Sequence, residues 1–131
     1  LIPAALRVGE HTILDGADLE ISVEGPVILE KACNSLSTFA LKYDMMGADP
    51  TIHVRSRQTG DSLRLPGGRK QLKKLLIDRK IPAARRDLIP VITDGEQILA
   101  VYGLGTDTAL AACPGDRALI VKIWVRGDKK P

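Results

Sequence analysis

The sequence is short of aromatic side chains and of long apolar runs, and each shortage excludes a class of function. Only four aromatic residues occur among 131, namely Phe39, Tyr43, Tyr102 and Trp124, and they are too scattered to form a platform for stacked bases. No apolar segment approaches the roughly 20 residues that a membrane-spanning helix needs. The N-terminus also lacks the charged and then apolar plan of a secretion signal, so we expect a cytoplasmic protein with no membrane partner.

Cysteine and histidine are scarce, and their spacing does not suggest a metal site. Cys33 and Cys113 lie 80 positions apart with no C-x-x-C pair, and His11 and His53 are the only histidines. Free, buried thiols are therefore expected rather than metal ligands or a disulfide. His53 stands between apolar neighbours at positions 52 and 54, a pattern typical of a strand.

Motifs that would carry catalysis are missing as well. The acidic residues are isolated, and neither a Ser-x-x-Lys nor a Gly-x-Ser-x-Gly motif occurs. We therefore assign no catalytic residue and expect no catalysis from this chain alone. The length fits a single domain over residues 1–131, and because the chain opens on leucine rather than methionine, we expect an excised piece of a longer protein.

What the sequence does contain is an uneven distribution of charge. Residues 1–50 hold 3 Lys or Arg against 8 Asp or Glu, whereas residues 51–131 hold 16 against 8, which gives net charges of −5 and +8. Residues 55–86 alone carry 11 basic side chains, with Asp61 and Asp78 as the acidic ones. Such a density favours a polyanionic partner through steering and counterion release. The alternative is a solvated face without a ligand.

The pattern of apolar residues predicts a β-rich α+β fold. Short apolar stretches separated by turn residues predict a β-meander over residues 5–8, 12–14, 19–23 and 27–29. One helical turn is expected at 43–46, and further strands are expected at 37–41, 51–57, 89–93, 97–102 and 118–125.

Two short helices are expected within the basic stretch. The first covers about residues 70–79, because Leu72, Leu75 and Leu76 form an apolar stripe at helical spacing. Lysines lie on the opposite side together with Ile77, and Pro82 ends the helix near position 80. The second helix covers about residues 83–87.

Gly67 and Gly68 precede the first expected helix, so exposed N–H groups at the helix end would form a phosphate loop. The segment is not a Walker loop for ATP, because Lys70 follows Arg69 instead of glycine and is not followed by Ser or Thr. A docked phosphate of an RNA backbone and a plain turn without a ligand are the two alternatives.

The basic stretch also carries a recognisable order of motifs. Residues 54–68 contain an Arg-x-Arg-x-x-Gly-Asp turn, residues 72–82 a Lys-Lys-Leu helix with an Ile-Pro stop, and residues 86–91 an Arg-Asp-x-x-Pro segment. In this order and spacing they resemble the C-terminal domain of bacterial tRNA(Ile)-lysidine synthase. The resemblance covers about residues 37–105. It departs at residues 104–106, where many relatives carry an arginine, so no RNA contact is expected there.

The resemblance implies a sandwich-like domain of mixed sheet that grips tRNA(Ile) at its acceptor stem. The family's enzyme is a ligase of tRNA processing: it uses ATP to adenylate the wobble cytidine of a minor isoleucine tRNA and joins lysine to it, forming lysidine. Its nucleotide-binding PP-loop ATPase domain is marked by a Ser-Gly-Gly-x-Asp-Ser loop, which this chain lacks. We therefore expect no cofactor here, and expect ATP with Mg, and lysine, to bind elsewhere in the parent protein. A homodimer is one option for that parent protein.

The charge and the resemblance together assign RNA contacts. A-form RNA offers phosphates and 2′-hydroxyls more readily than base edges, which suits a surface rich in Arg and Lys. Some basic residues are expected to be structural instead, with Arg55 or Arg57 paired to Asp61, and Arg86 paired to Asp87 or Asp78. The alternative function is an interaction module that docks onto its own catalytic domain or a second copy. The residues assigned to RNA are Arg55, Arg57, Arg64, Arg69, Lys70, Lys73, Lys74, Arg79, Lys80, Arg85 and Arg86.

Overall fold

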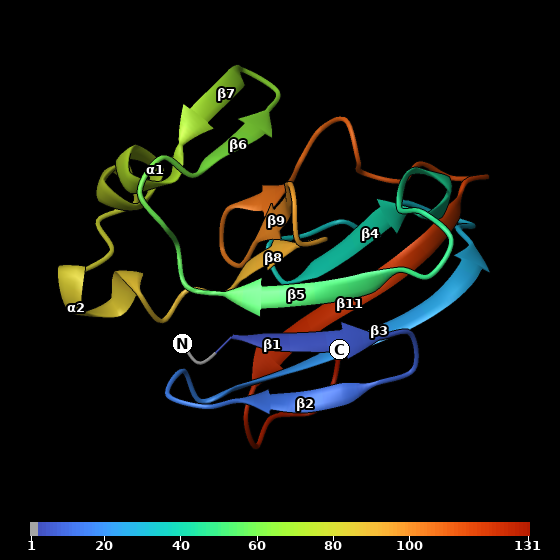
Figure 1. Ribbon diagram of the computed structural model, residues 1–131, viewed down its shortest axis with the longest axis horizontal. Helices are drawn as coiled ribbons and strands as arrows, with labels where there is room; N and C mark the ends of the chain where they lie inside the picture. Colours follow the sequence, from blue (N-terminus) through green and yellow to red (C-terminus); the bar gives the residue numbers. More distant parts are fainter. Residues whose placement is uncertain (1–2) are drawn as a thin grey trace.

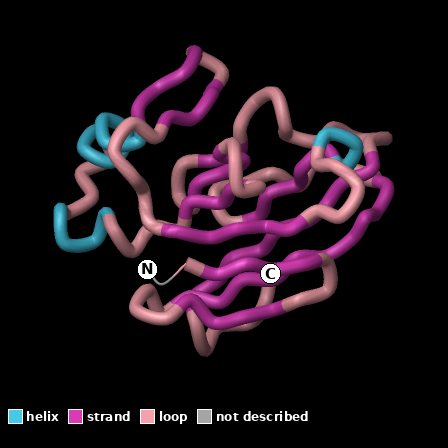
Figure 2. The backbone as a smooth tube through the Cα atoms, viewed as in Figure 1, coloured by secondary structure: helices cyan, strands magenta, loops and turns pink. Residues whose placement is uncertain are grey.

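Two antiparallel β-sheets form the centre of the computed structural model, which describes residues 3–131 (Figure 1). The helical segments are few and lie outside these sheets (Figure 2). The first sheet has the order β1 (Ala4–Arg7), β5 (Thr51–Arg55), β8 (Val91–Thr93), β9 (Ile98–Val101) and β10 (Gly105–Thr106). The second sheet has the order β2 (His11–Leu14), β3 (Leu19–Ile28), β11 (Arg117–Val125) and β4 (Thr38–Lys42).

The main apolar core joins the two sheets. Alternate side chains along a strand point to the same face, and on β3 and β5 this places Ile21, Val23, Ile52 and Val54 in one buried cluster. Phe39 on β4 is fully buried in the same cluster. The predicted β-rich, sandwich-like α+β fold is therefore confirmed. Every pairing among the described strands is antiparallel, however, so the expectation of a mixed sheet is wrong.

The N-terminal strands do not form the predicted meander. β1 pairs with β5 in the first sheet, while β2 pairs with β3 in the second, so two neighbours in sequence lie in different sheets. The strands expected at 19–23 and 27–29 are one strand, β3, whose register against β11 shifts near Ala118. Gly25 stands at this bulge with a φ of 115°, and a Cβ atom there would lie 2.7 Å from the Ala118 carbonyl oxygen. The turn-like residues 24–26 therefore mark a bulge inside a strand rather than its end.

Residues 56–90 leave the sheets between β5 and β8, and we call them the basic excursion. In Figure 1 it is the green and yellow part that projects at upper left, with the hairpin β6 (Ser62–Leu65) and β7 (Gly68–Gln71), then α1 (Leu72–Asp78) and α2 (Ala83–Arg86). A second buried cluster packs the excursion against β8, β9 and the turn that follows β9. The cluster comprises Leu63, Leu72, Leu75, Leu76, Val91, Val101 and Leu104. The segments that carry the basic side chains are thus anchored to the first sheet by this buried cluster.

The first helix is shorter than predicted at both ends. Lys70 belongs to β7, whose four residues are all exposed, so no apolar alternation marks this strand in the sequence. At the other end the Ile81 N–H donates to the Leu76 carbonyl at 3.1 Å and the Lys80 N–H to the Ile77 carbonyl at 2.9 Å, a Schellman motif. Lys80 adopts a φ of 57°, the left-handed conformation that glycine usually takes there. This motif ends α1 at Asp78, and α2 matches its predicted position to within one residue.

Most other predicted elements are confirmed to within a few residues. β8 and β9 form the expected hairpin, β11 is the expected last strand, and η1 (Tyr43–Met45) is the expected helical turn. His53 lies on β5 opposite Thr93, which confirms its position on a strand.

The cysteines are free, but Cys113 is exposed and Cys33 is half-buried, so the predicted burial of these thiols is wrong. Within residues 3–131 no helix is long and apolar enough to cross a membrane. Over the same residues no three side chains of His, Cys, Asp or Glu are grouped to hold a metal ion.

Candidate nucleic-acid interface

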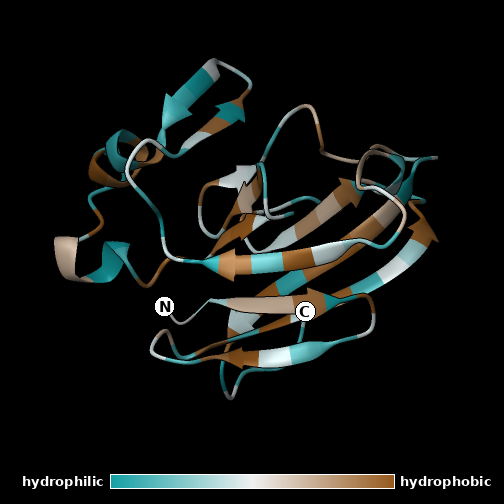
Figure 3. Ribbon diagram, in the orientation of Figure 1, coloured by the Kyte–Doolittle hydropathy of each residue, from teal (hydrophilic) through white to brown (hydrophobic). Residues whose placement is uncertain are grey.

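All eleven basic residues predicted to contact RNA lie on the basic excursion or at the adjoining end of β5. Figure 3 shows hydrophilic residues along β7 and on parts of α1 and α2. Hydrogen bonds divide these basic residues into two groups. Side-chain bonds to described residues are made by Arg55, Arg64, Arg69, Arg79 and Arg86. The others make no hydrogen bond or ion pair to any residue from 3 to 131, and we call them the open basic set: Arg57, Lys70, Lys73, Lys74, Lys80 and Arg85.

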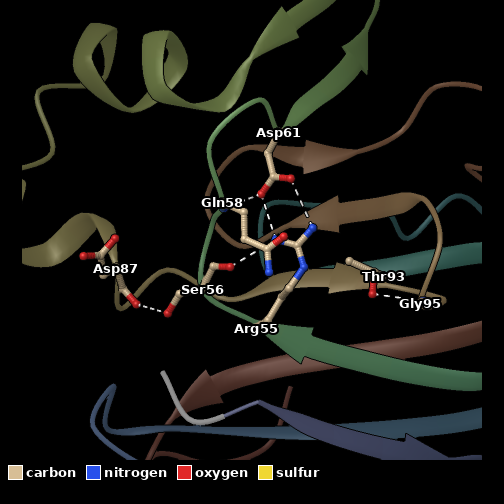
Figure 4. A network of polar contacts seen from close by, with 7 residues as sticks. All are labelled: Arg55, Ser56, Gln58, Asp61, Asp87, Thr93 and Gly95. Atoms are coloured by element: carbon tan, nitrogen blue, oxygen red, sulfur yellow. Dashed lines mark hydrogen bonds and ion pairs between the residues drawn. The ribbon is translucent and has the colours of Figure 1, made fainter.

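Arg55 holds the turn that begins the excursion. Its Nη1 and Nη2 donate to the two carboxylate oxygens of Asp61 at 2.7 and 3.1 Å, and Nη1 also donates to the Ser56 carbonyl at 3.0 Å (Figure 4). The same carboxylate accepts the Gln58 backbone N–H at 2.6 Å. The prediction that Arg55 or Arg57 pairs with Asp61 is confirmed for Arg55. The side chains of Arg55 and Asp61 are 22% and 11% exposed, so this ion pair is mostly shielded from solvent and holds the turn.

Arg64 is also held from within the protein. Its Nε donates at 3.0 Å to Asp107, a buried carboxylate that also accepts the Ala109 backbone N–H at 2.8 Å. Arg64 stands directly opposite Arg69 in the β6–β7 hairpin, an arrangement of like charges that is unfavourable unless each finds a partner. Arg69 donates to the Ser62 hydroxyl at 3.0 Å. Sequence reasoning missed Asp107, which carries no local pattern and meets Arg64 only through the fold.

These arginines surround a polar hollow of about 270 Å³ whose charges are balanced. Its cations face an equal number of carboxylates, so a phosphate would gain little net attraction there. The hollow is therefore better explained as an internal ionic network than as the site of a polyanion. Its charged lining residues are Arg55, Arg64, Arg69, Asp61, Glu96 and Asp107.

Arg79, at the end of α1, and Arg86, on α2, each donate a hydrogen bond to a backbone carbonyl outside their own helix. Arg79 donates to the Gly103 carbonyl at 3.2 Å, which ties the end of α1 to the turn after β9. Arg86 donates through Nε to the Ile81 carbonyl at 3.0 Å. The expected pairing of Arg86 with Asp87 or Asp78 is not among the ion pairs of residues 3–131, where its Nε meets the Ile81 carbonyl instead.

The open basic set occupies consecutive elements of the excursion. Lys70 lies on β7, Lys73 and Lys74 on α1, and Arg85 on α2, and all four are exposed. As predicted, Ile77 falls among the lysines, and it is 46% exposed. No carboxylate pairs with these four cations in the part of the chain that the structure describes, so their positive potential stays available to a polyanion.

The two glycines do not stand at a helix end. Pro66 and Gly67 form the two-residue turn of the β6–β7 hairpin, and Gly68 pairs with Leu65. α1 begins only at Leu72, four residues after Gly68. The predicted phosphate loop at the start of a helix is therefore wrong in its geometry, because the residues between Gly67 and the helix form a strand. The alternative of a plain turn describes these glycines.

The pKa values of two carboxyl groups outside the excursion are lowered by their neighbours. The pKa of Glu24 lies below its ordinary value because Lys130 donates a hydrogen bond to it, with Lys122 adding charge attraction. Burial alone would raise the pKa of Asp94, but N–H donors of Gln97 and Glu96, each at 2.9 Å from Oδ1, bring it below its ordinary value. Asp94 thereby closes the β8–β9 turn beside the polar hollow.

Comparison with known proteins places this geometry in a family. The sequence model of the TilS substrate C-terminal domain matches residues 52–124. A solved structure described as a crystal structure of a TilS C-terminal domain has a TM-score of 0.78 and 26% identity, covering 96% of this chain and 99% of that one.

Curated relatives match a shorter part of the chain. The tRNA(Ile)-lysidine synthase of Clostridioides difficile is 50% identical over 50 residues, which are 38% of this chain and 11% of that protein. Those of Bacillus licheniformis and Exiguobacterium sibiricum are 44% identical over 45 residues and 45% identical over 53 residues. These matches cover 33% and 40% of this chain, and 10% and 13% of the relatives. The chain thus matches about a tenth of the length of each curated relative.

Proposed function

The chain belongs to the family of TilS substrate C-terminal domains, and from this membership we propose that it binds tRNA through the open basic set. The observation that carries the proposal is the division of the basic residues. Arginines with internal partners build the excursion, whereas the open basic set has no partner among residues 3–131, and all its members except the half-buried Arg57 are exposed. The whole charge of the open basic set is therefore available for contacts with phosphates.

The proposed contacts are with the backbone of an RNA stem. A-form RNA presents its phosphates and 2′-hydroxyls to side chains more readily than its base edges. Exposed lysines on short elements suit such phosphates because an ammonium group is a flexible point charge that needs no fixed geometry. We place the stem at the acceptor end of tRNA(Ile), as the family resemblance suggests. We assign the ATP-dependent joining of lysine to the wobble cytidine to a region of the parent protein, in the cytoplasm, outside this chain.

Salt-dependent binding of a tRNA(Ile) acceptor-stem hairpin tests this proposal. With six phosphate contacts, the slope of log Kobs against log salt should be roughly −5, since each neutralised phosphate contributes about −0.9. The double variant Lys73→Glu/Lys74→Glu should weaken binding and reduce the slope to roughly −4, because four phosphate contacts remain at about −0.9 each. Fluorescence anisotropy at several salt concentrations gives both quantities.

A matched control keeps the total charge change the same. Arg7→Glu/Lys31→Glu alters two exposed cations of the acidic half and should leave both the affinity and the slope close to those of the unaltered chain. If the unaltered chain does not bind the hairpin at low salt, the tRNA proposal fails. The charge asymmetry between residues 1–50 and 51–131 then favours docking onto another protein surface or a second copy. If the two double variants weaken binding equally, the assignment to α1 fails.

A further inference from the structure

Arg57 differs from the other arginines of the excursion because it is half-buried and has no partner among residues 3–131. Its Nε atom is shielded from solvent and donates to no described acceptor. The neighbouring Arg55, by contrast, is held by Asp61 at 2.7 and 3.1 Å. Taking a charged donor away from water is unfavourable unless an acceptor replaces the water. The Arg57 guanidinium therefore has hydrogen-bonding capacity that no acceptor among residues 3–131 uses.

A hollow of about 440 Å³ lies beside Arg57 and has room for an anion. The turn 58–61 lines one part of it, and Gln71 and Lys73, at the junction of β7 and α1, line another. Arg57 and Lys73 thus reach the same cavity from segments that are 16 positions apart in the sequence. This hollow is distinct from the charge-balanced one that contains Arg64.

The charges around this second hollow are not balanced. Its one carboxylate, Asp61, is already engaged by both Nη atoms of Arg55 and by the Gln58 backbone N–H at 2.6 Å. Arg57 and Lys73 form no ion pair with a carboxylate among residues 3–131. The local field around this hollow therefore favours an anion.

The turn itself adds neutral donors. Its N–H at Asp61 donates to the Gln58 carbonyl at 3.1 Å, whereas the N–H groups of Thr59 and Gly60 donate to no described acceptor. Gly60 has a φ of 90°, and apart from its two chain neighbours no described residue has an atom within 4 Å of the place where a Cβ would stand. A ligand can therefore approach the backbone of the turn closely. Successive free N–H groups at such a turn are a common feature of anion sites.

We propose that the hollow between the turn 58–61 and the start of α1 binds one phosphate group. Arg57 supplies a planar fork of donors and Lys73 a second positive charge. In tRNA the ligand is a phosphodiester of the backbone, and in this respect the inference rests on the proposed function and deepens it. The site has one defined geometry, unlike the exposed lysines around it, so it sets the register in which the excursion lies along the RNA.

Two ligands and one side-chain signal test the site directly. Because Nε of Arg57 is shielded, its Nε–Hε group should exchange slowly enough to give an NMR signal at neutral pH. Inorganic phosphate and the acceptor-stem hairpin, titrated separately, should both shift this signal and that of the Gly60 amide. A poly-glutamate peptide of equal charge should not shift them. Larger shifts from the peptide would overturn the phosphate assignment in favour of an acidic protein partner.

Variants distinguish specific binding of a phosphate in the hollow from non-specific attraction by the positive charge of the excursion. Arg57→Lys keeps the positive charge but removes the planar, bidentate guanidinium. It should weaken hairpin binding about tenfold, because a charge-assisted bidentate contact is lost. Lys73→Gln should weaken it further than Lys74→Gln, which removes an equal charge from the same helix outside the hollow. Thermal unfolding of each variant verifies that the fold is intact. Lys73 is exposed, so its variant remains a test even if the changes at Arg57 disturb folding.

The outcomes separate this site from the proposed function. If the hairpin binds but Arg57→Lys binds as tightly as the unaltered chain, the phosphate site is wrong while tRNA binding stands. If the hairpin does not bind but phosphate shifts the Arg57 signal, the site stands for a free phosphate ligand and the tRNA proposal fails. If neither ligand shifts the signal, the site is overturned. Equal effects of Lys73→Gln and Lys74→Gln would also overturn it.

Discussion

Replacing Asp61 by asparagine removes one charge with almost no change in shape, and we expect it to lower the free energy of unfolding by about 2–3 kcal/mol. The carboxylate accepts two hydrogen bonds from Arg55, at 2.7 and 3.1 Å, and one from the Gln58 backbone at 2.6 Å. An asparagine side chain has a single oxygen, so at least one of these donors loses its acceptor. The expected loss is below the roughly 3–5 kcal/mol for a fully buried pair, because the Arg55 side chain is 22% exposed.

Urea denaturation followed by circular dichroism measures this change, and a double-mutant cycle isolates the pair. Asp61→Asn, Arg55→Met and the double variant should give a coupling energy of about 1–3 kcal/mol, as residues in one hydrogen-bonded network do. Asp78→Asn is the control. It removes a carboxylate from an exposed position of α1, and should change the free energy of unfolding by less than about 0.5 kcal/mol. A coupling energy near zero, or an equal effect of Asp78→Asn, would refute the structural role of the Arg55–Asp61 pair.

Two further predictions concern the ends of elements. Lys80→Gly should raise the free energy of unfolding by about 0.5–1 kcal/mol, because relief of left-handed strain exceeds the entropy that glycine adds to the unfolded chain; a lower Tm would contradict this. Burial opposes the charged form of Asp94, but the N–H groups of Gln97 and Glu96 prevail and lower its pKa. Its contribution to stability is thus complete above the unfolded pKa of about 3.9 and is lost as pH falls through the lower folded pKa. Asp94→Asn should flatten the pH dependence of stability in this acidic range, and urea titrations with unchanged pH dependence would contradict that.

Patterns that depend on neighbours in sequence predicted their structures well. Ala118 to Val125 is apolar enough to be a strand in any arrangement, and it forms most of β11. The β8–β9 hairpin follows from two apolar runs around the turn residues 94–96. Leu72, Leu75 and Leu76 have helical spacing and lie buried on α1 as expected. In each case the residues that decide the structure lie within a few positions of one another.

Predictions failed where the partner is distant or the strand is polar. β7 consists of Gly68–Gln71, four exposed residues with no apolar alternation, and only pairing with β6 makes it a strand. The helix was therefore expected to begin two residues too early, and Gly67 and Gly68 were placed at its end. In β3 the residues 24–26 have the composition of a turn, yet pairing with β11 carries the strand through them as a bulge. Such pairings depend on contacts between segments that sequence spacing does not encode.

The sequence by itself determined that this protein is a β-rich domain with a concentrated positive charge, because composition, apolar spacing and motif order are local properties. It also determined the family, through the motifs between residues 54 and 91. Only the tertiary structure decided what each cation does. Arg64 meets Asp107 across 43 positions, and Arg79 meets the Gly103 carbonyl across 24, while Nε of Arg57 meets no acceptor among residues 3–131. A guanidinium has the same charge in all three places, and the acceptors that folding brings to it decide whether it stabilises the protein or remains available to bind a ligand.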